Sequence, residues 1–206
     1  MRIKSLLTLI SLISPIKCEM EPFVVGGKRA KIKDFPHSGF LKVRCKEISS
    51  GEISPWVCGS SILNTKIVLT AAHCLWGCAT NSNITITVGH SHNHRGKSHT
   101  GHSFVVHGGY VDTEFYYDIA LARINAEFVF GPTIKRVALL KKPPYFEKAQ
   151  VAGWGLTDEI MEISSNILYY INQTVWKKED CEDVIGAIPK GTICASSKRI
   201  DSYVAM

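Results

Sequence analysis

Two absences limit what this sequence can be: it has few charged residues, and beyond its N-terminus it has no long hydrophobic run. Charged residues make up 20% of the 206 residues and hydrophobic residues 45%, a balance that allows a sizeable core and argues against intrinsic disorder. A permanent membrane span needs about 18 consecutive apolar residues, and no later segment has them. We therefore expect one domain, or two tightly packed halves, and no membrane partner.

The sequence also lacks a dense basic cluster, although its formal net charge is +6. Its lysines and arginines are scattered, and they are not interleaved with aromatic residues as in nucleic-acid-binding surfaces. The charge therefore indicates a solvated basic surface, and no nucleic-acid partner is expected.

The N-terminus combines a basic start with a short apolar run. Met1–Lys4 carries two basic residues, and Ser5–Ser14 is too short for a permanent anchor. This arrangement predicts a signal peptide over residues 1–18 and a secreted, extracellular protein. Asn83 and Asn172 each begin an Asn-x-Thr sequon, which predicts N-glycosylation on the same route.

Seven cysteines are present, and secretion changes how they are interpreted. Disulfides form in an oxidising compartment, whereas the same spacings in the cytosol would suggest a metal site. Cys18 falls at the end of the predicted signal peptide. The spacing alone does not fix how the other six pair: Cys45, Cys58, Cys74, Cys78, Cys181 and Cys194.

Short β-rich runs recur along the chain with turn residues between them. One brief helix is predicted near Lys177–Ile185, and the histidine-laden stretch His90–His107 is predicted to be a loop. Many strands without intervening helices favour an all-β barrel or sandwich. The predicted strands are Phe40–Val43, Ser60–Leu63, Ile67–Thr70, Ile84–Val88, Phe104–His107, Ile119–Ile124, Gln150–Trp154 and Leu168–Trp176.

His73 is the strongest candidate for chemistry. It closely follows the apolar run Ile67–Thr70, and a disulfide between Cys58 and Cys74 would pin it just beyond a buried strand. An immobilised histidine with an ordinary pKa of about 6.5 can take up and return a proton near neutrality. A lone histidine after an apolar run is more often structural, so the neighbouring motifs decide the interpretation.

Four motifs together resemble those of the chymotrypsin-like serine proteases, and they occur in that family's order. Val24–Gly27 is similar to the mature N-terminus, and Leu69–Cys74 is similar to the histidine motif. Asp118–Leu121 is similar to the aspartate motif, and Val151–Gly155 is similar to the Gly-Trp-Gly segment. The resemblance implies an all-β fold of two antiparallel, six-stranded Greek-key barrels with the active site in the cleft between them. The second barrel would be incomplete within these residues. A short propeptide over residues 19–23 and a peptidase domain over residues 24–206 are also implied.

The resemblance gives roles to individual residues. His73 is expected to be the general base, and Asp118 the carboxylate that orients and stabilises it. The implied disulfides are Cys58–Cys74 and Cys181–Cys194, which leaves Cys45 and Cys78 to pair by elimination. A rival interpretation is a zinc site, which needs reduced thiols and is disfavoured in a secreted chain; its ligands would be Cys58, His73, Cys74 and Cys78.

A second metal alternative lies in the histidine-laden stretch. Alternate histidines of an extended segment point the same way and suit zinc or copper, but the stretch lacks the carboxylates that calcium prefers. A solvated loop whose histidines become charged below about pH 6.5 is favoured. No metal and no cofactor are therefore expected; the histidines concerned are His90, His92, His94, His99 and His102.

The nucleophile motif of the resembled family, Gly-Asp-Ser-Gly-Gly, does not occur in residues 1–206. Read without gaps after Cys194, Asp201 falls at the base of that family's specificity pocket, where an aspartate favours cleavage after Lys or Arg. Phe23, rather than a basic residue, precedes the expected mature N-terminus at Val24. Because no nucleophile is present, the 206 residues are expected to be inactive.

The leading interpretation is a secreted serine endopeptidase that acts on protein or peptide substrates, binds protein protease inhibitors and is monomeric when folded. The alternative is a noncatalytic homologue that serves as a secreted binding or decoy protein. Keeping both His73 and Asp118 favours the first interpretation, whereas the missing serine favours the second. A metal-binding protein that uses the histidine-laden stretch is the weakest of the three.

Overall fold

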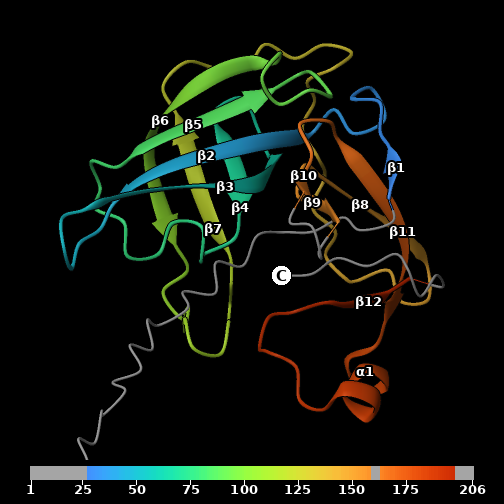
Figure 1. The fold of residues 1–206 in the computed structure, drawn as a ribbon. Coiled ribbons are helices and arrows are strands. Elements are labelled where there is room, and N and C mark those ends of the chain that lie inside the picture. Colours follow the sequence, from blue (N-terminus) through green and yellow to red (C-terminus); the bar gives the residue numbers. More distant parts are fainter. Residues whose placement is uncertain (1–26, 159–162, 198–206) are drawn as a thin grey trace, which may run out of the picture.

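The computed structural model describes residues 27–158 and 163–197, which form two β-rich halves (Figure 1). The predicted signal peptide and propeptide, Val24 and Asp201 lie outside the described residues. Within the described residues, no helix is long and apolar enough to cross a membrane.

The first half is a closed antiparallel barrel with the strand order β2-β3-β4-β7-β6-β5. β2 pairs with both β3 and β5, and this double pairing closes the barrel. Since β5, β6 and β7 follow β4 in reversed spatial order, the strands have a Greek-key arrangement. The strands are β2 (Ser38–Lys46), β3 (Ile53–Ile62), β4 (Ile67–Thr70), β5 (Asn83–Val88), β6 (Lys97–Val106) and β7 (Ala120–Ile124).

Alternation along the strands builds the core of this barrel. On β2, Leu41, Val43 and Cys45 are buried whereas Arg44 and Lys46 are exposed, because successive side chains of a strand point to opposite faces. Apolar side chains from all six strands pack together inside, among them Leu41, Ile62, Val68, Ile86, Ile124 and the partly buried Phe104.

The second half is an open four-stranded sheet centred on β11 (Tyr169–Trp176). β8 (Lys148–Gly153) pairs along one edge of β11, and β1 (Lys28–Arg29) and β12 (Cys194–Ser196) pair with opposite ends of the other edge. The all-β, two-barrel class is confirmed, and this sheet represents the second barrel in the described residues. The remaining elements are the ribbon of β9 (Leu156–Asp158) and β10 (Ile163–Ser164), and α1 (Lys178–Ile185).

A separate apolar cluster joins the two halves. Phe40 of β2 packs edge-on against Trp154, with ring centroids 5.7 Å apart. Leu168 is fully buried in the same cluster, beside Phe35 and Ile32 from the segment that leads from β1 to β2. The halves therefore share a hydrophobic junction that belongs to neither barrel core.

The prediction of a loop over His90–His107 is wrong for most of that stretch, because Lys97–Val106 forms strand β6. His99 is buried in β6 and lies edge-on to the ring of Phe128, with centroids 4.7 Å apart. The predicted strand Phe104–His107 overlaps only the end of β6. Polar residues concealed the rest, since most of its side chains face outward and its pairing partners come from β5 and β7. Strand β3 also begins well before the predicted Ser60.

Candidate active site

The pairing of β4 with β7 brings His73 and Asp118 to the same end of the first barrel. Thr70, the last residue of β4, lies opposite Ala120, the first residue of β7. His73 follows β4 and Asp118 precedes β7, so the two side chains meet where the antiparallel pair ends. The register of β4 on β7 thus brings His73 and Asp118 together, although they are far apart in the sequence.

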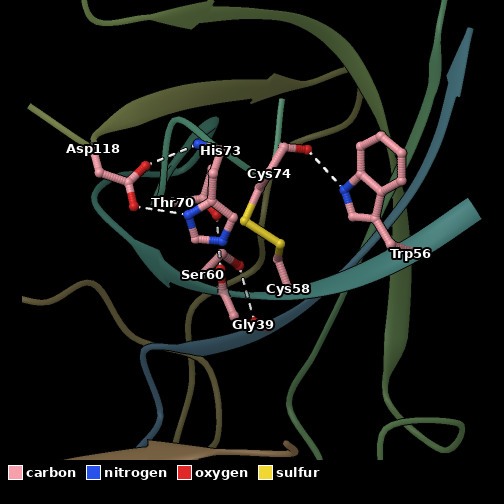
Figure 2. The surroundings of a disulfide bond; sticks show 9 residues. Gly39, Trp56, Cys58, Ser60, Thr70, His73, Cys74 and Asp118 are labelled. Atoms are coloured by element: carbon pink, nitrogen blue, oxygen red, sulfur yellow. Dashed lines mark hydrogen bonds and ion pairs between the residues drawn. A yellow bond between two sulfur atoms is a disulfide. The ribbon is translucent and has the colours of Figure 1, made fainter. Parts of the chain in front are cut away.

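Figure 2 shows that Asp118 holds His73 through two hydrogen bonds. The backbone N–H of His73 donates to Oδ1 at 2.8 Å, and its ring Nδ1 donates to Oδ2 at 2.7 Å. The side chains are 23% and 16% exposed, respectively. A carboxylate only accepts, so Nδ1 carries the proton and Nε2 is left with the lone pair that a general base requires.

The environment of Asp118 keeps it ionised. Burial raises the pKa of its carboxyl group, but the hydrogen bonds from the ring and backbone of His73 and the positive charge of that ring outweigh burial. The backbone N–H of Ala72 acts in the same direction, and the net pKa lies below its ordinary value. A carboxylate stabilised in this way can stabilise an imidazolium that forms beside it.

The Cys58–Cys74 disulfide fixes the segment that carries His73 (Figure 2). Trp56 reinforces this anchor by donating its indole N–H to the carbonyl of Cys74 at 3.0 Å. The hydroxyl of Thr70 donates to the carbonyl of Gly59 at 2.8 Å and ties β4 to β3. His73 is therefore held by a covalent link and by hydrogen bonds on both sides.

The alternative zinc site does not fit these residues as they are bonded. Ligand atoms of Cys58, His73 and Cys74 do lie within 4.8 Å of one another, but zinc binds thiolates and the two sulfurs form a disulfide. The fourth proposed ligand, Cys78, is bonded to Cys45. The third predicted disulfide, Cys181–Cys194, is also formed.

An aromatic residue that the sequence did not indicate, Phe115, lies beside His73. The ring of Phe115 lies edge-on to that of His73, with centroids 6.4 Å apart. Phe115 and Tyr117 adopt left-handed backbone angles, with φ of 54° and 53°, a conformation that bulky residues rarely accept. The N–H of Tyr117 donates to the carbonyl of Lys190 at 2.8 Å. No sequence pattern signals contacts that depend on folding of both halves.

A cavity of about 520 Å³ lies beside Asp118 and is lined from both halves. Thr70, Asp118 and Ser60 line it from the first barrel, and Gln150 and Ala152 line it from β8. The cavity between the halves therefore borders the His73–Asp118 pair on the side of Asp118.

Two serines of the described chain, Ser165 and Ser196, are engaged in hydrogen bonds away from His73. The hydroxyl of Ser165 accepts from the N–H of Ile167 at 3.0 Å, and that of Ser196 accepts from the indole of Trp176 at 2.7 Å. Both lie in the second half. Asn83 and Asn172 are exposed on β5 and β11, so both sequons remain predicted glycosylation sites.

A Greek-key barrel with a His–Asp pair at the edge of an inter-barrel cleft defines the chymotrypsin-fold class of proteins. A family model described as Trypsin matches residues 24–204, and the chain belongs to this family.

Individual relatives support the same assignment. Hypodermin-A of Hypoderma lineatum is 34% identical over 136 residues, which cover 65% of this chain and 49% of that protein. Chymotrypsin of Phaedon cochleariae is 29% identical over 187 residues, covering 84% and 62%, respectively. The chain thus spans between about half and two thirds of the length of these curated relatives.

The fold is similar to that of a solved structure of a scabies mite inactivated protease paralogue, S-D1. The TM-score is 0.73 at 25% identity, and the match covers 85% of this chain and 75% of that one. An HL collagenase structure matches with a TM-score of 0.70 at 22% identity, covering 84% and 73%, and supports the fold alone.

Proposed function

We propose that His73 and Asp118 are the general-base part of a secreted serine-type endopeptidase that acts on protein or peptide substrates. The observation that carries this proposal is the double hydrogen bond between the two residues, which leaves Nε2 of His73 free to accept a proton. Placement of Asp118 at a cavity lined from both halves supports a site of substrate binding next to the pair. Membership of the trypsin family favours peptide-bond hydrolysis over other acyl-transfer chemistry.

We also propose that residues 1–206 alone do not hydrolyse peptides. His73 can activate a nucleophile but cannot replace one, and the Gly-Asp-Ser-Gly-Gly segment that supplies serine and oxyanion donors is not among these residues. A fluorophosphonate probe tests this directly. We expect no labelling of the 206-residue chain beside an active trypsin that is labelled stoichiometrically; stoichiometric labelling of the chain would refute the proposal.

Sequencing the transcript through the codons that follow Cys194 tests the peptidase function itself. An in-frame Gly-Asp-Ser-Gly-Gly segment would supply the nucleophile for His73. A product containing it should react with the fluorophosphonate and lose this reaction in His73→Ala. Preference for Lys or Arg at the cleaved bond rests on Asp201 alone, and a panel of peptide substrates for that product tests it.

A noncatalytic homologue is the second candidate function. Its support is the structural similarity to a protein described as an inactivated protease paralogue. Such a protein would keep the surface of the fold as a secreted binding or decoy module, with no requirement for chemistry at His73. Transcripts that never encode the serine, together with a secreted protein whose partner binding survives His73→Ala, would favour this function over the first.

A further inference from the structure

One short loop of the first barrel makes a set of hydrogen bonds to the other half. This segment, His90–Arg95, is called the His loop below. The carbonyl of Ser91 accepts from the N–H of Leu168 and from the indole of Trp154, both at 2.8 Å. Its hydroxyl accepts from the N–H of Ile32 at 2.9 Å. Ser91 thus connects the first barrel to three separate segments of the apolar junction.

The neighbouring residues of the His loop extend this connection. The N–H of Asn93 donates to the carbonyl of Asn166 at 2.9 Å, and His92 forms an isolated β-bridge with Ile167. Asn93 is buried. The loop is therefore part of the interface between the halves and is not a free surface loop.

Two histidine rings hold the His loop in shape. Nδ1 of His90 accepts from the N–H of His92 at 2.8 Å, and Nδ1 of His92 accepts from the N–H of His94 at 3.3 Å. Each ring bonds the backbone two residues further along, as the oxygen of an Asx turn does. Ser91 lies between His90 and His92 in the sequence, so the orientation of its carbonyl and hydroxyl groups depends on both turns.

These hydrogen bonds require unprotonated Nδ1 atoms. Protonation converts Nδ1 into a donor that faces another N–H, so the bond is lost and the two groups repel. The nearby charges are positive: Arg95 lies on the loop, and Nζ of Lys42 from β2 is 3.5 Å from Nδ1 of His94. The segment 165–168 that packs on the loop carries no titratable group, and Lys31 and Lys33 flank Ile32.

The pKa of His92 agrees with this geometry. Partial desolvation lowers it, and the positive charges of Arg95, His94 and His90 lower it further. The folded loop therefore takes up a proton at His92 less readily than the unfolded loop does. The contribution of neutral His92 to the stability of the folded loop is fully present above about pH 6.5. It decreases as the pH falls below that value and is lost below the lowered pKa.

We propose that the His loop is an acid-sensitive latch between the two halves, which protonation of His92 opens by releasing Ser91. Opening frees the backbone amides of Ile32 and Leu168 and the indole of Trp154. The cavity beside Asp118 is lined from both halves, so a released latch also alters the cleft. The physical trigger is a fall in pH from about 7.5 to 5, the range in which histidine gains its charge.

Amide hydrogen exchange of the disulfide-bonded chain at pH 7.5 and pH 5 tests the latch. Protection factors at Ile32 and Leu168 are divided by that of Ile86, which lies in the core of the first barrel and reports opening of that barrel. We expect this ratio to fall severalfold at pH 5, because protonation of His92 removes the acceptor for the N–H of His94. A ratio that does not change with pH would overturn the proposal.

The double variant His90→Asn with His92→Asn provides a matched comparison. Asparagine keeps an acceptor for the backbone two residues on but does not titrate, so the ratio should stay high at both pH values. His90→Ala with His92→Ala removes the acceptors and should lower the ratio at both. His102→Asn, which changes an exposed histidine of β6, should behave like the unmodified chain. A pH-dependent loss in the asparagine variant equal to that of the unmodified chain would refute the latch.

Discussion

The carboxylate of Asp118 binds His73 twice, through the ring and through the backbone of the same residue. The ring contact fixes the tautomer, while the backbone contact fixes the position of the chain that carries the ring. Since β4, β7 and the Cys58–Cys74 disulfide all belong to the first barrel, the pair is assembled within that barrel.

Replacing Asp118 with asparagine should reduce the free energy of unfolding by about 1–3 kcal/mol at pH 7, because hydrogen bonds to a charged acceptor are lost. Burial raises the pKa of Asp118, but the bonds from His73 lower it below 3.8. The stabilisation is therefore present above that ordinary value and lost as the pH falls through the lowered folded pKa. Urea unfolding from pH 7 to 2 measures it. Asp34→Asn, at an exposed carboxylate, is the control and should change little; an equal loss would contradict the prediction.

Removing the Cys45–Cys78 disulfide should destabilise the first barrel. The bond joins residues 33 positions apart and both sulfurs are buried, so changing both cysteines to alanine should cost about 2–4 kcal/mol. Thermal unfolding under non-reducing conditions measures the loss. Changing Cys181 and Cys194 together should leave exchange of the Ile86 amide unaltered, because that bond lies in the second half. Faster exchange there would show that the two bonds act on one cooperative unit.

A methyl group at Gly96 should be poorly tolerated. A Cβ built there would lie 2.5 Å from the carbonyl oxygen of Val88, a backbone atom that cannot move aside alone. Gly96→Ala should therefore cost about 1–3 kcal/mol through overpacking. Gly108→Ala, where the surroundings are open, is the matched control and should be nearly neutral. Denaturant midpoints of the two variants decide the matter, and indistinguishable values would contradict the expectation.

The buried ring of His99 should make global stability sensitive to acid. Desolvation lowers its pKa and the charge of Lys97 lowers it further, whereas the hydrogen bond to the carbonyl of Ala126 raises it. The folded state resists protonation, so the free energy of unfolding should decrease as the pH falls below about 6.5, by up to about 1.4 kcal/mol for each pH unit of pKa shift.

His99→Gln, which keeps a donor for Ala126, should flatten this decrease between pH 6.5 and 5. His102→Gln changes an exposed ring on the same strand and should leave the slope as it was. Urea unfolding at several pH values provides the slopes. If His99→Gln retains the slope of the unmodified chain, the acid sensitivity arises elsewhere.

The sequence was sufficient for the class of fold and for the position of the His–Asp pair. Alternating apolar residues marked most barrel strands, and the short motifs around His73 and Asp118 placed both residues at strand ends. Only the end of β6, from Phe104, was predicted, because the outward side chains of the rest are polar and the strand is stabilised by pairing with β5 and β7. The local residue pattern does not show which strands will pair.

The parts of the site that could not be predicted arise from contacts between distant segments. Phe115 lies beside His73 because its backbone takes a left-handed conformation, and Tyr117 is tied to Lys190 of the second half. The role of Ser91 was equally hidden, since it is defined by partners near positions 32, 154 and 168. The histidines around it were conspicuous in the sequence, but only the structure shows which nitrogen each ring uses.

The arrangement of β11 sets an order of events during synthesis. The first barrel is contiguous from β2 to β7, and the segment after β7 that packs on it ends near Val137, so it can fold long before β11 is made. β1 must wait for β11, since Arg29 pairs with Tyr169, 140 residues later. The segment around Lys28 and Arg29 thus remains unpaired through most of translation. In a nascent chain, the hydrogen bonds between His73 and Asp118 would therefore form well before β1 pairs with β11.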